Sequence, residues 1–248
     1  MGACGEVKDN SGPADGPPML GDGDIVTDTP LPGDGGPLPT TAALWLRMDD
    51  PPMDGALDSA GTHVTSCTSS TSCPRQIAGK IVGAYTFAGT RLTVAPASDL
   101  APGTGYTLAL WVRVEQPPDP TLGNATIAAK NLSDLDASFA LSVSPSLVPQ
   151  FYSSSDASQN LDGQTTLVIN TWHHLAATWD GTTKIIYVDG SRAGSGPATV
   201  MPNNAQLGMT IGQRLSTTMP LTFTGSIDDL FVFNRALTAA EVAQLAAQ

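Results

Sequence analysis

The chain has 248 residues, with 25 glycines, 20 prolines and only 14% charged residues. This composition favours short strands joined by turns over long helices, so we expect an all-β fold. The formal net charge of -12 argues against nucleic acid as a partner, because that binding depends on many Lys and Arg side chains. No apolar run approaches the roughly 18 residues that cross a bilayer, so we expect no transmembrane segment.

Residues 1–40 are rich in Gly, Pro and Asp and almost free of aromatic residues. Such a segment cannot bury enough surface to offset its ordering entropy, which predicts a disordered acidic linker before one domain at 41–248. Gly2-Ala3-Cys4 resembles the end of a bacterial lipoprotein signal, with Cys4 as the lipid anchor. An ordinary N-terminal cysteine is the alternative.

Two further cysteines, Cys67 and Cys73, lie close together in a polar stretch. Their spacing suggests a local disulfide bond and therefore an oxidising compartment, with free thiols as the alternative.

Strand patterns begin at Ala43 and continue along the domain. The predicted early strands are Ala43–Met48, Ile81–Phe87, Tyr106–Val114, Ala125–Lys130, Ser138–Val143 and Thr165–Ile169. The four tryptophans, Trp45, Trp111, Trp172 and Trp179, lie within strand patterns and are expected in the core.

An antiparallel meander is the clearest local prediction. Strands at Trp172–Trp179, Lys184–Val188 and Ser191–Gly194 are separated by Asp180-Gly181 and Asp189-Gly190, dipeptides that suit tight hairpin turns.

The C-terminal segment predicts a strand followed by a helix. Phe223–Phe233 has apolar residues on both faces, as in a central strand. Thr238 and Glu241 form a capping box for a helix that begins at Ala239, with Val242 and Leu245 on its buried face.

Motifs in this order resemble the LamG-like (Laminin G type 3), concanavalin A-like jelly-roll domains of bacterial secreted proteins and lipoproteins. The matching segments are Leu44–Asp49, Asp58–Gly61, Gly83–Gly89, Tyr106–Arg113, Asn170–Gly181, Ile186–Gly190, Met209–Gly212 and Phe223–Thr238. The resemblance implies an antiparallel two-sheet sandwich with a short C-terminal helix.

Catalytic residues are not evident in the sequence. Glycoside hydrolysis needs two carboxyl groups that flank the scissile bond. No Glu residue of this sequence lies in a predicted central strand. An enzyme that uses Asp carboxylates stays open as an alternative. His173 and His174 are neighbours in a strand, so they point to opposite faces and are unsuited to chelating one ion.

Calcium is the one metal that the resemblance implies. It places a structural Ca²⁺ where the first and last strands meet, with Asp49 or Asp58 and Asp228 or Asp229 as ligands. Alternatively, Asp58 shapes a turn and one of Asp228 and Asp229 points to solvent.

A sugar site would combine an aromatic side chain with amide and carboxylate groups. The candidate cluster is Gln150, Tyr152, Asp156, Asn160 and Asp162, beside Phe151. An ordinary core strand followed by a polar loop is the alternative.

We therefore expect a non-catalytic binding module outside the cytoplasm or on the outer-membrane surface, with a glycan or a cell-surface protein as its partner. A structural module of an envelope assembly is the alternative within the non-catalytic class.

Overall fold

A computed structural model describes residues 41–52, 54–61, 63–67, 73–131, 137–153, 160–198, 206–214 and 221–248. The predicted linker at 1–40 and its Cys4 lie outside the described residues. In the described part, no helix is long and apolar enough to cross a membrane.

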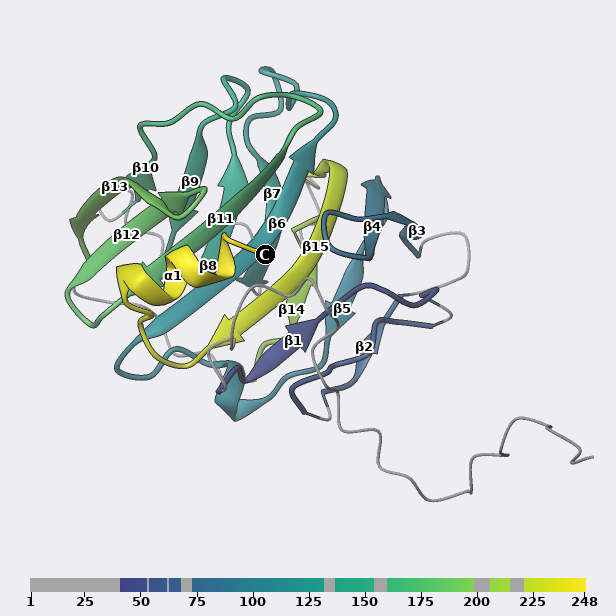
Figure 1. Ribbon diagram of the computed structural model, residues 1–248, viewed down its shortest axis with the longest axis horizontal. Helices are drawn as coiled ribbons and strands as arrows, with labels where there is room; N and C mark the ends of the chain where they lie inside the picture. The colour runs from purple at the N-terminus through teal and green to yellow at the C-terminus, as the bar shows by residue number, and fades with distance from the viewer. Residues whose placement is uncertain are drawn as a thin grey trace, which may run out of the picture. The chain divides into compact units, whose positions relative to one another are not determined.

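Two antiparallel sheets form the domain over the described ranges (Figure 1). The first sheet has eight strands, in the order β13 (Ser191–Pro197), β12 (Thr183–Val188), β11 (Trp172–Trp179), β6 (Tyr106–Val114), β15 (Thr224–Phe233), β4 (Gly83–Ala88) and β3 (Arg75–Ala78), with β1 (Leu44–Leu46) also paired to β15.

The second sheet has seven strands in the same described ranges. Their order is β10 (Leu161–Asp162), β9 (Pro149–Tyr152), β8 (Ala137–Val143), β7 (Ala125–Asn131), β14 (Met209–Ile211), β5 (Leu92–Val94) and β2 (Thr65–Ser66). A short 3₁₀ helix at Ser98–Leu100 follows β5, and α1 (Ala239–Leu245) ends the chain. The expected two-sheet sandwich with a C-terminal helix is confirmed.

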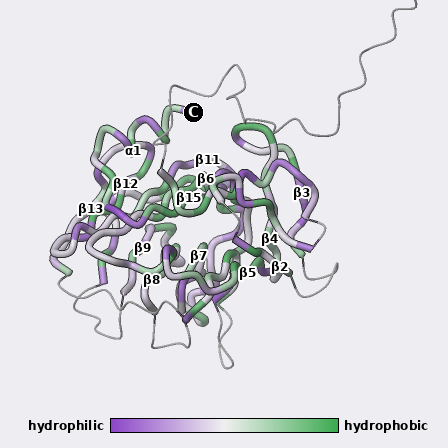
Figure 2. The backbone as a smooth tube through the Cα atoms, turned by 90° about the horizontal axis from the view of Figure 1, so that it is seen from below, coloured by the Kyte–Doolittle hydropathy of each residue, from purple (hydrophilic) through white to green (hydrophobic). Residues whose placement is uncertain are grey.

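The main core lies between the two sheets, which form separate layers in Figure 2. Alternate residues of each strand point inward, because successive side chains of a strand leave opposite faces. The inward set of β6 is Leu108, Leu110, Val112 and Val114, and these side chains are at most 1% exposed.

A second, smaller core covers the outer face of the eight-stranded sheet. Residues from β6, β11, β12 and β15 meet the buried side of α1 there, and the members are Ala109, Ala176, Tyr187, Phe231, Phe233, Leu237, Val242 and Leu245. The predicted capping box is present, since Thr238 accepts from the Glu241 N–H and Glu241 accepts from the Thr238 N–H. The helix therefore begins where the sequence predicted and covers apolar surface that would otherwise meet water.

The predicted meander is also confirmed. β11 pairs with β12, and β12 with β13, through the two Asp-Gly turns. Gly181 has φ 99°, while Asp189 and Gly190 have φ 50° and 76°. Positive φ at these positions matches the right-handed twist of the joined strands, which is why these dipeptides select hairpins.

The predicted strand at Thr165–Ile169 is wrong. The segment is an irregular loop before β11, in which Leu167 is buried while Val168 and Ile169 are 57% and 38% exposed. Its β-branched residues are typical of a strand. The next strand, β11, already pairs with β6 and β12 along its two edges, so it leaves no edge for this segment to join.

The tryptophan prediction holds in part. Trp111 and Trp179 are each 6% exposed, whereas Trp45 and Trp172 are only partly buried on the first sheet.

We predict that Gly212→Ala destabilises the fold more than Gly89→Ala. Both glycines have positive φ, 82° and 80°, so each substitution costs about 1 to 2 kcal/mol in backbone strain. A Cβ at Gly212 would also overlap the ring of the buried Phe87, adding roughly 1 to 3 kcal/mol, whereas the space beside Gly89 is open. Chemical denaturation measures both losses, and equal values would contradict the packing argument.

Candidate functional site

Three residues of the predicted sugar cluster form one hydrogen-bonded chain. Tyr152 donates to the Gln150 side-chain oxygen at 2.6 Å, and the Gln150 amide donates to Asp162 at 2.7 Å. Pairing of β9 with β10 produces this arrangement, because Gln150 lies directly opposite Asp162. The sequence prediction missed Asn124, which directly precedes β7 and whose amide donates to the Tyr152 hydroxyl.

The other two members of that cluster are not part of the chain. Asp156 lies outside the described residues. Asn160 is described, and its side-chain oxygen is buried without a hydrogen-bond partner. Burial raises the pKa of Tyr152 to about 12, so its hydroxyl keeps its proton at neutral pH.

A pocket of about 580 Å³ adjoins Asn124, and we call it the loop pocket. It lies between the loop that joins β6 to β7 and the segment that enters β15. Proline rings and Leu122 provide apolar walls, while amide and hydroxyl groups provide hydrogen bonds. The lining residues are Gln116, Pro117, Pro118, Asp119, Pro120, Leu122, Gly123, Asn124, Ala125, Leu221, Thr222 and Thr224.

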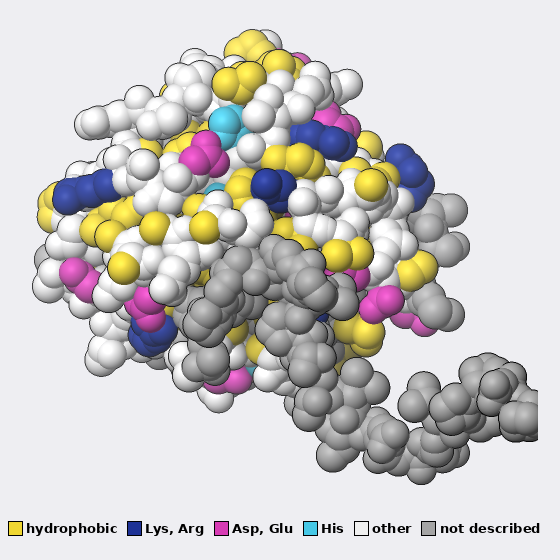
Figure 3. Space-filling view, viewed as in Figure 1, with side chains coloured by type: hydrophobic (Ala, Val, Ile, Leu, Met, Phe, Trp, Pro, Cys, Tyr) yellow, Lys and Arg dark blue, Asp and Glu magenta, His cyan; other side chains and the backbone are white. Residues whose placement is uncertain are grey.

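A second pocket, of about 330 Å³, lies on the outer face of the eight-stranded sheet, and we call it the arginine pocket. Its lining residues are Arg75, Ile77, Thr86, Arg113, Glu115 and Asn170. In Figure 3 basic side chains, one of them beside acidic side-chain atoms, lie on this face near the upper ends of β15 and β4.

Each pocket is lined by a single carboxylate among the described residues, Glu115 in one and Asp119 in the other. Glu115 accepts hydrogen bonds from Arg113 and Ser226 at 2.9 and 2.8 Å. Glu241 is bound to Arg235 and to the helix cap. Glycoside hydrolysis requires two carboxyl groups facing one bond, and neither pocket provides that pair from the described side chains.

The four aspartates expected to bind calcium are all held by hydrogen bonds within the protein. Asp49 accepts from the Gly83 N–H at 2.8 Å and from Arg47 Nε at 3.0 Å. Asp58 accepts from the backbone N–H groups of Trp45, Ala60 and His63, and it also contacts the His63 ring at 2.7 Å. These hydrogen bonds lower the pKa of Asp58 against the opposing effect of its burial. Asp58 therefore shapes the turn that follows β1.

Asp228 and Asp229 are both buried, at 0% and 5% exposure, so the alternative that one points to solvent is wrong. The register of β15 against β6 shifts between Asp228 and Phe231, and Asp229 has φ 43°. This bulge inserts an extra residue and interrupts the alternation of faces.

The aspartate pair fastens neighbouring segments to β15. Asp228 accepts from the backbone N–H groups of Lys80 and Ile81 at 2.8 and 3.0 Å, and Asp229 accepts from the Trp45 indole at 2.6 Å. Burial raises the pKa of Asp228 to about 7 and that of Asp229 to about 8, and the charge of Asp49 adds to both effects.

These aspartates do not form a complete metal site. Asp228 has one buried oxygen without a partner, which is the atom best suited to a cation. In the described ranges, however, no three His, Cys, Asp or Glu side chains lie in an arrangement that could hold an ion. Calcium therefore stays a prediction.

A higher melting temperature of the protein in calcium than in EDTA would support the predicted calcium site, and equal melting temperatures would count against it.

The neighbouring histidines have different environments. His173 contacts Asp189 at 2.8 Å and accepts from the Val168 N–H at 3.0 Å. His174 is buried edge-on against Trp111, and burial lowers its pKa to about 4. Both side chains therefore support packing and loop structure.

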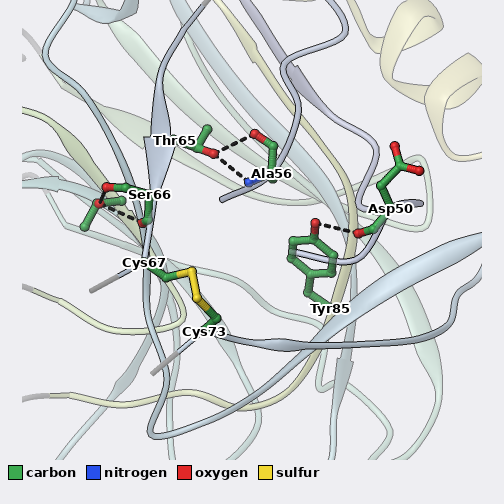
Figure 4. Close-up of a disulfide and its surroundings, with 8 residues drawn as sticks. Asp50, Ala56, Thr65, Ser66, Cys67, Cys73 and Tyr85 are labelled. Atoms are coloured by element: carbon green, nitrogen blue, oxygen red, sulfur yellow. Dashed lines mark hydrogen bonds between the residues drawn. A yellow bond between two sulfur atoms is a disulfide. The ribbon is translucent and has the colours of Figure 1, made fainter. Parts of the chain in front are cut away.

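The predicted disulfide joins Cys67 and Cys73, with Cα atoms 5.1 Å apart. Figure 4 shows it beside the end of β2, where Thr65 bonds to the backbone of Ala56 and Ser66 bonds to its neighbour on β5. The bond connects the end of β2 to the segment that leads into β3.

We predict that stability falls as pH rises from about 5 to 8 in EDTA. Asp228 and Asp229 have pKa values of about 7 and 8 in the fold, above the ordinary value of 3.8, so the folded protein binds more protons than the unfolded chain in this range. Each such group gives a slope of at most about 1.4 kcal/mol per pH unit, and this contribution ends as the pH rises through the pKa of that group in the fold.

The variant Asp228→Asn keeps an oxygen for the Lys80 and Ile81 N–H groups but cannot ionise, so the slope should become smaller. Asp119→Asn, at an exposed position where hydrogen bonds lower the carboxyl pKa, is the matched control. Denaturation curves across this pH range test the pair, and an unchanged slope in Asp228→Asn would contradict the assignment.

Comparisons with known proteins agree with this architecture. Residues 86–243 match the Laminin G type 3 family model, described as the concanavalin A-like lectin/glucanases superfamily. No curated protein matches the chain.

Solved structures share the fold at low sequence identity. Domain 4 of an extracellular arabinanase from Geobacillus stearothermophilus, in complex with arabinotriose, is 20% identical with TM-score 0.62, over 83% of this chain and 98% of that one. The receptor-binding domain of botulinum neurotoxin type G is 17% identical with TM-score 0.62, over 83% of this chain and 51% of that one. A Trypanosoma rangeli sialidase is 17% identical with TM-score 0.62, over 84% of this chain and 33% of that one.

The chain thus spans about half of the toxin domain and a third of the sialidase. The family match covers more than half of the sequence and includes the meander and the central strand. The chain belongs to the concanavalin A-like lectin/glucanases superfamily.

Proposed function

We propose that this chain is a non-catalytic carbohydrate-binding module that acts outside the cytoplasm. The observation that carries the proposal is the loop pocket, together with the hydrogen-bonded chain of Asn124, Tyr152, Gln150 and Asp162 beside it. A sugar ring needs apolar surface for its C–H face and fixed polar groups for its hydroxyls. The proline-lined wall and the amide of Asn124 provide both.

The arabinotriose complex of the Geobacillus arabinanase domain supports this reading, because nearly all of that domain aligns with this fold. The single carboxylate in each pocket supports binding without hydrolysis. The disulfide supports an oxidising location, since such bonds persist outside the reducing cytoplasm. A protein partner at the cell surface and a structural role in an envelope assembly are the other non-catalytic candidates.

A glycan array probed with the full chain, in calcium and again in EDTA, tests the proposal. We expect capture of one class of glycan, without release of reducing sugar from that glycan. Absence of glycan binding in both buffers would favour a protein partner or a structural role. Turnover of a polysaccharide that is lost on replacing an Asp would establish an enzyme instead.

We predict that Tyr152→Phe weakens binding of the captured glycan about fivefold. The substitution removes the hydroxyl that joins Asn124 to Gln150, and one hydrogen bond contributes about 1 kcal/mol. Tyr85→Phe also removes a hydroxyl that bonds inside the protein, to the Asp50 carbonyl, and serves as the matched control. Calorimetric titration measures both affinities. Equal affinities of Tyr152→Phe and the unaltered protein would show that these hydrogen-bonded residues do not contribute to the site.

A further inference from the structure

The arginine pocket is built by a row of residues across five strands. Arg75 pairs with Thr86, Thr86 with Ser226, Ser226 with Arg113, and Arg113 with Trp172. All five side chains leave the same outer face of the sheet, because directly paired residues share a face. The two small residues in the middle of the row leave a hollow, and the longer side chains at its flanks form the walls.

Arg113 is held rigidly in one wall. Its Nη2 donates to Glu115 at 2.9 Å and to Ser226 at 3.3 Å, and its guanidinium carbon lies 5.2 Å from the centre of the Trp172 ring. Its Nε is buried without a partner, and the side chain is 28% exposed. The guanidinium group is therefore fixed in position while part of its donor capacity is unused.

Arg75 forms the opposite wall and is exposed. Among the described residues, its guanidinium forms no hydrogen bond or ion pair. Two cations thus face one hollow in a chain that has only 11 Lys and Arg residues and a net charge of -12. Glu115 balances Arg113, so the pocket keeps about one unit of positive charge. This local charge is opposite to that of the whole chain and favours an anionic ligand.

The remaining groups indicate what kind of anion fits. A net charge of about one suits a carboxylate better than a phosphate monoester, which carries between one and two negative charges. Guanidinium groups bind carboxylates through two parallel hydrogen bonds. Asn170, Thr86 and Glu115 can bond to hydroxyls, and Ile77 gives an apolar contact. Carboxylate, hydroxyls and an apolar face together describe an acidic sugar.

We propose that the arginine pocket binds the carboxylate-bearing sugar residue of an acidic glycan. This inference rests on the proposed function and names the class of glycan. The two pockets adjoin at the end of β6, where Glu115 lines one and Gln116 lines the other, and both backbone N–H groups donate to the Thr224 carbonyl. A glycan chain with an acidic residue in the arginine pocket therefore has the loop pocket next to it for the adjoining residue.

The test titrates the full chain with methyl β-D-glucuronide and with methyl β-D-glucoside, which differ only at C6, a carboxylate in the first and a hydroxymethyl group in the second. The Trp172 indole and Arg113 Nε signals are followed by NMR. We expect the glucuronide to shift both signals and the glucoside to leave them unchanged. We also expect Arg75→Gln to weaken glucuronide binding about tenfold or more, because it removes a charge-assisted contact. Arg91→Gln, which removes the same charge beside β5 of the other sheet, should bind normally.

Several outcomes would overturn the inference. They are equal shifts with both sugars, unchanged glucuronide binding in Arg75→Gln, and binding of acetate or inorganic phosphate as tight as that of the glucuronide. Tyr152→Phe separates this inference from the proposed function, because it alters the loop-pocket side and should leave monosaccharide binding here unchanged. An array that captures only neutral glycans, with the same strength in Arg75→Gln, would overturn the acidic class while the binding module stands.

Discussion

The arrangement of the whole first sheet depends on β15, a central strand that is buried on both faces. Its inward side chains fill the core between the sheets, while Phe231 and Phe233 pack outward beneath α1. Along one edge it pairs with β4 and then with β1, and along the other it pairs with β6. Any change in its register would therefore move both cores and three strand pairings at once.

The bulge in β15 lies at the point where its partner changes from β4 to β1. Asp228 holds the turn before β4 and Asp229 holds the Trp45 side chain of β1, so the two buried carboxyls join segments that are distant in sequence. A buried carboxylate loses the hydration that stabilises its charge, so burial disfavours ionisation and raises the pKa of both residues. The same residues thus locate the strands and make the stability of the fold sensitive to pH.

Function on this fold depends on where the strands end and on which faces stay uncovered. α1 covers one end of the outer face of the first sheet, and the row from Arg75 to Trp172 crosses the part that it leaves open. The loop after β6 then provides a second pocket beside the first. A rigid scaffold with polar groups at its rim suits recognition of an extended ligand, because little further ordering is needed on binding.

The sequence by itself determined the elements whose signals are local. The Asp-Gly turns, the capping box before Ala239 and the spacing of Cys67 and Cys73 depend on interactions within a few residues, and the structure contains all three. The all-β class and the order of the main strands also followed from alternation and from the family resemblance. These features were readable because neighbouring residues specify them without reference to distant parts of the chain.

Only the tertiary structure decided which distant side chains meet. Three successive strand pairings, from β3 to β6, bring Arg75 and Arg113 to one pocket. Asn124 likewise reaches Tyr152 across the second sheet. The bulge that buries both Asp228 and Asp229 depends on two partner strands meeting along one edge of β15. The segment Thr165–Ile169 has strand-forming residues but no sheet edge to join. Pairing partners of this kind are set by the packing of the whole domain, and no local pattern in the sequence records them.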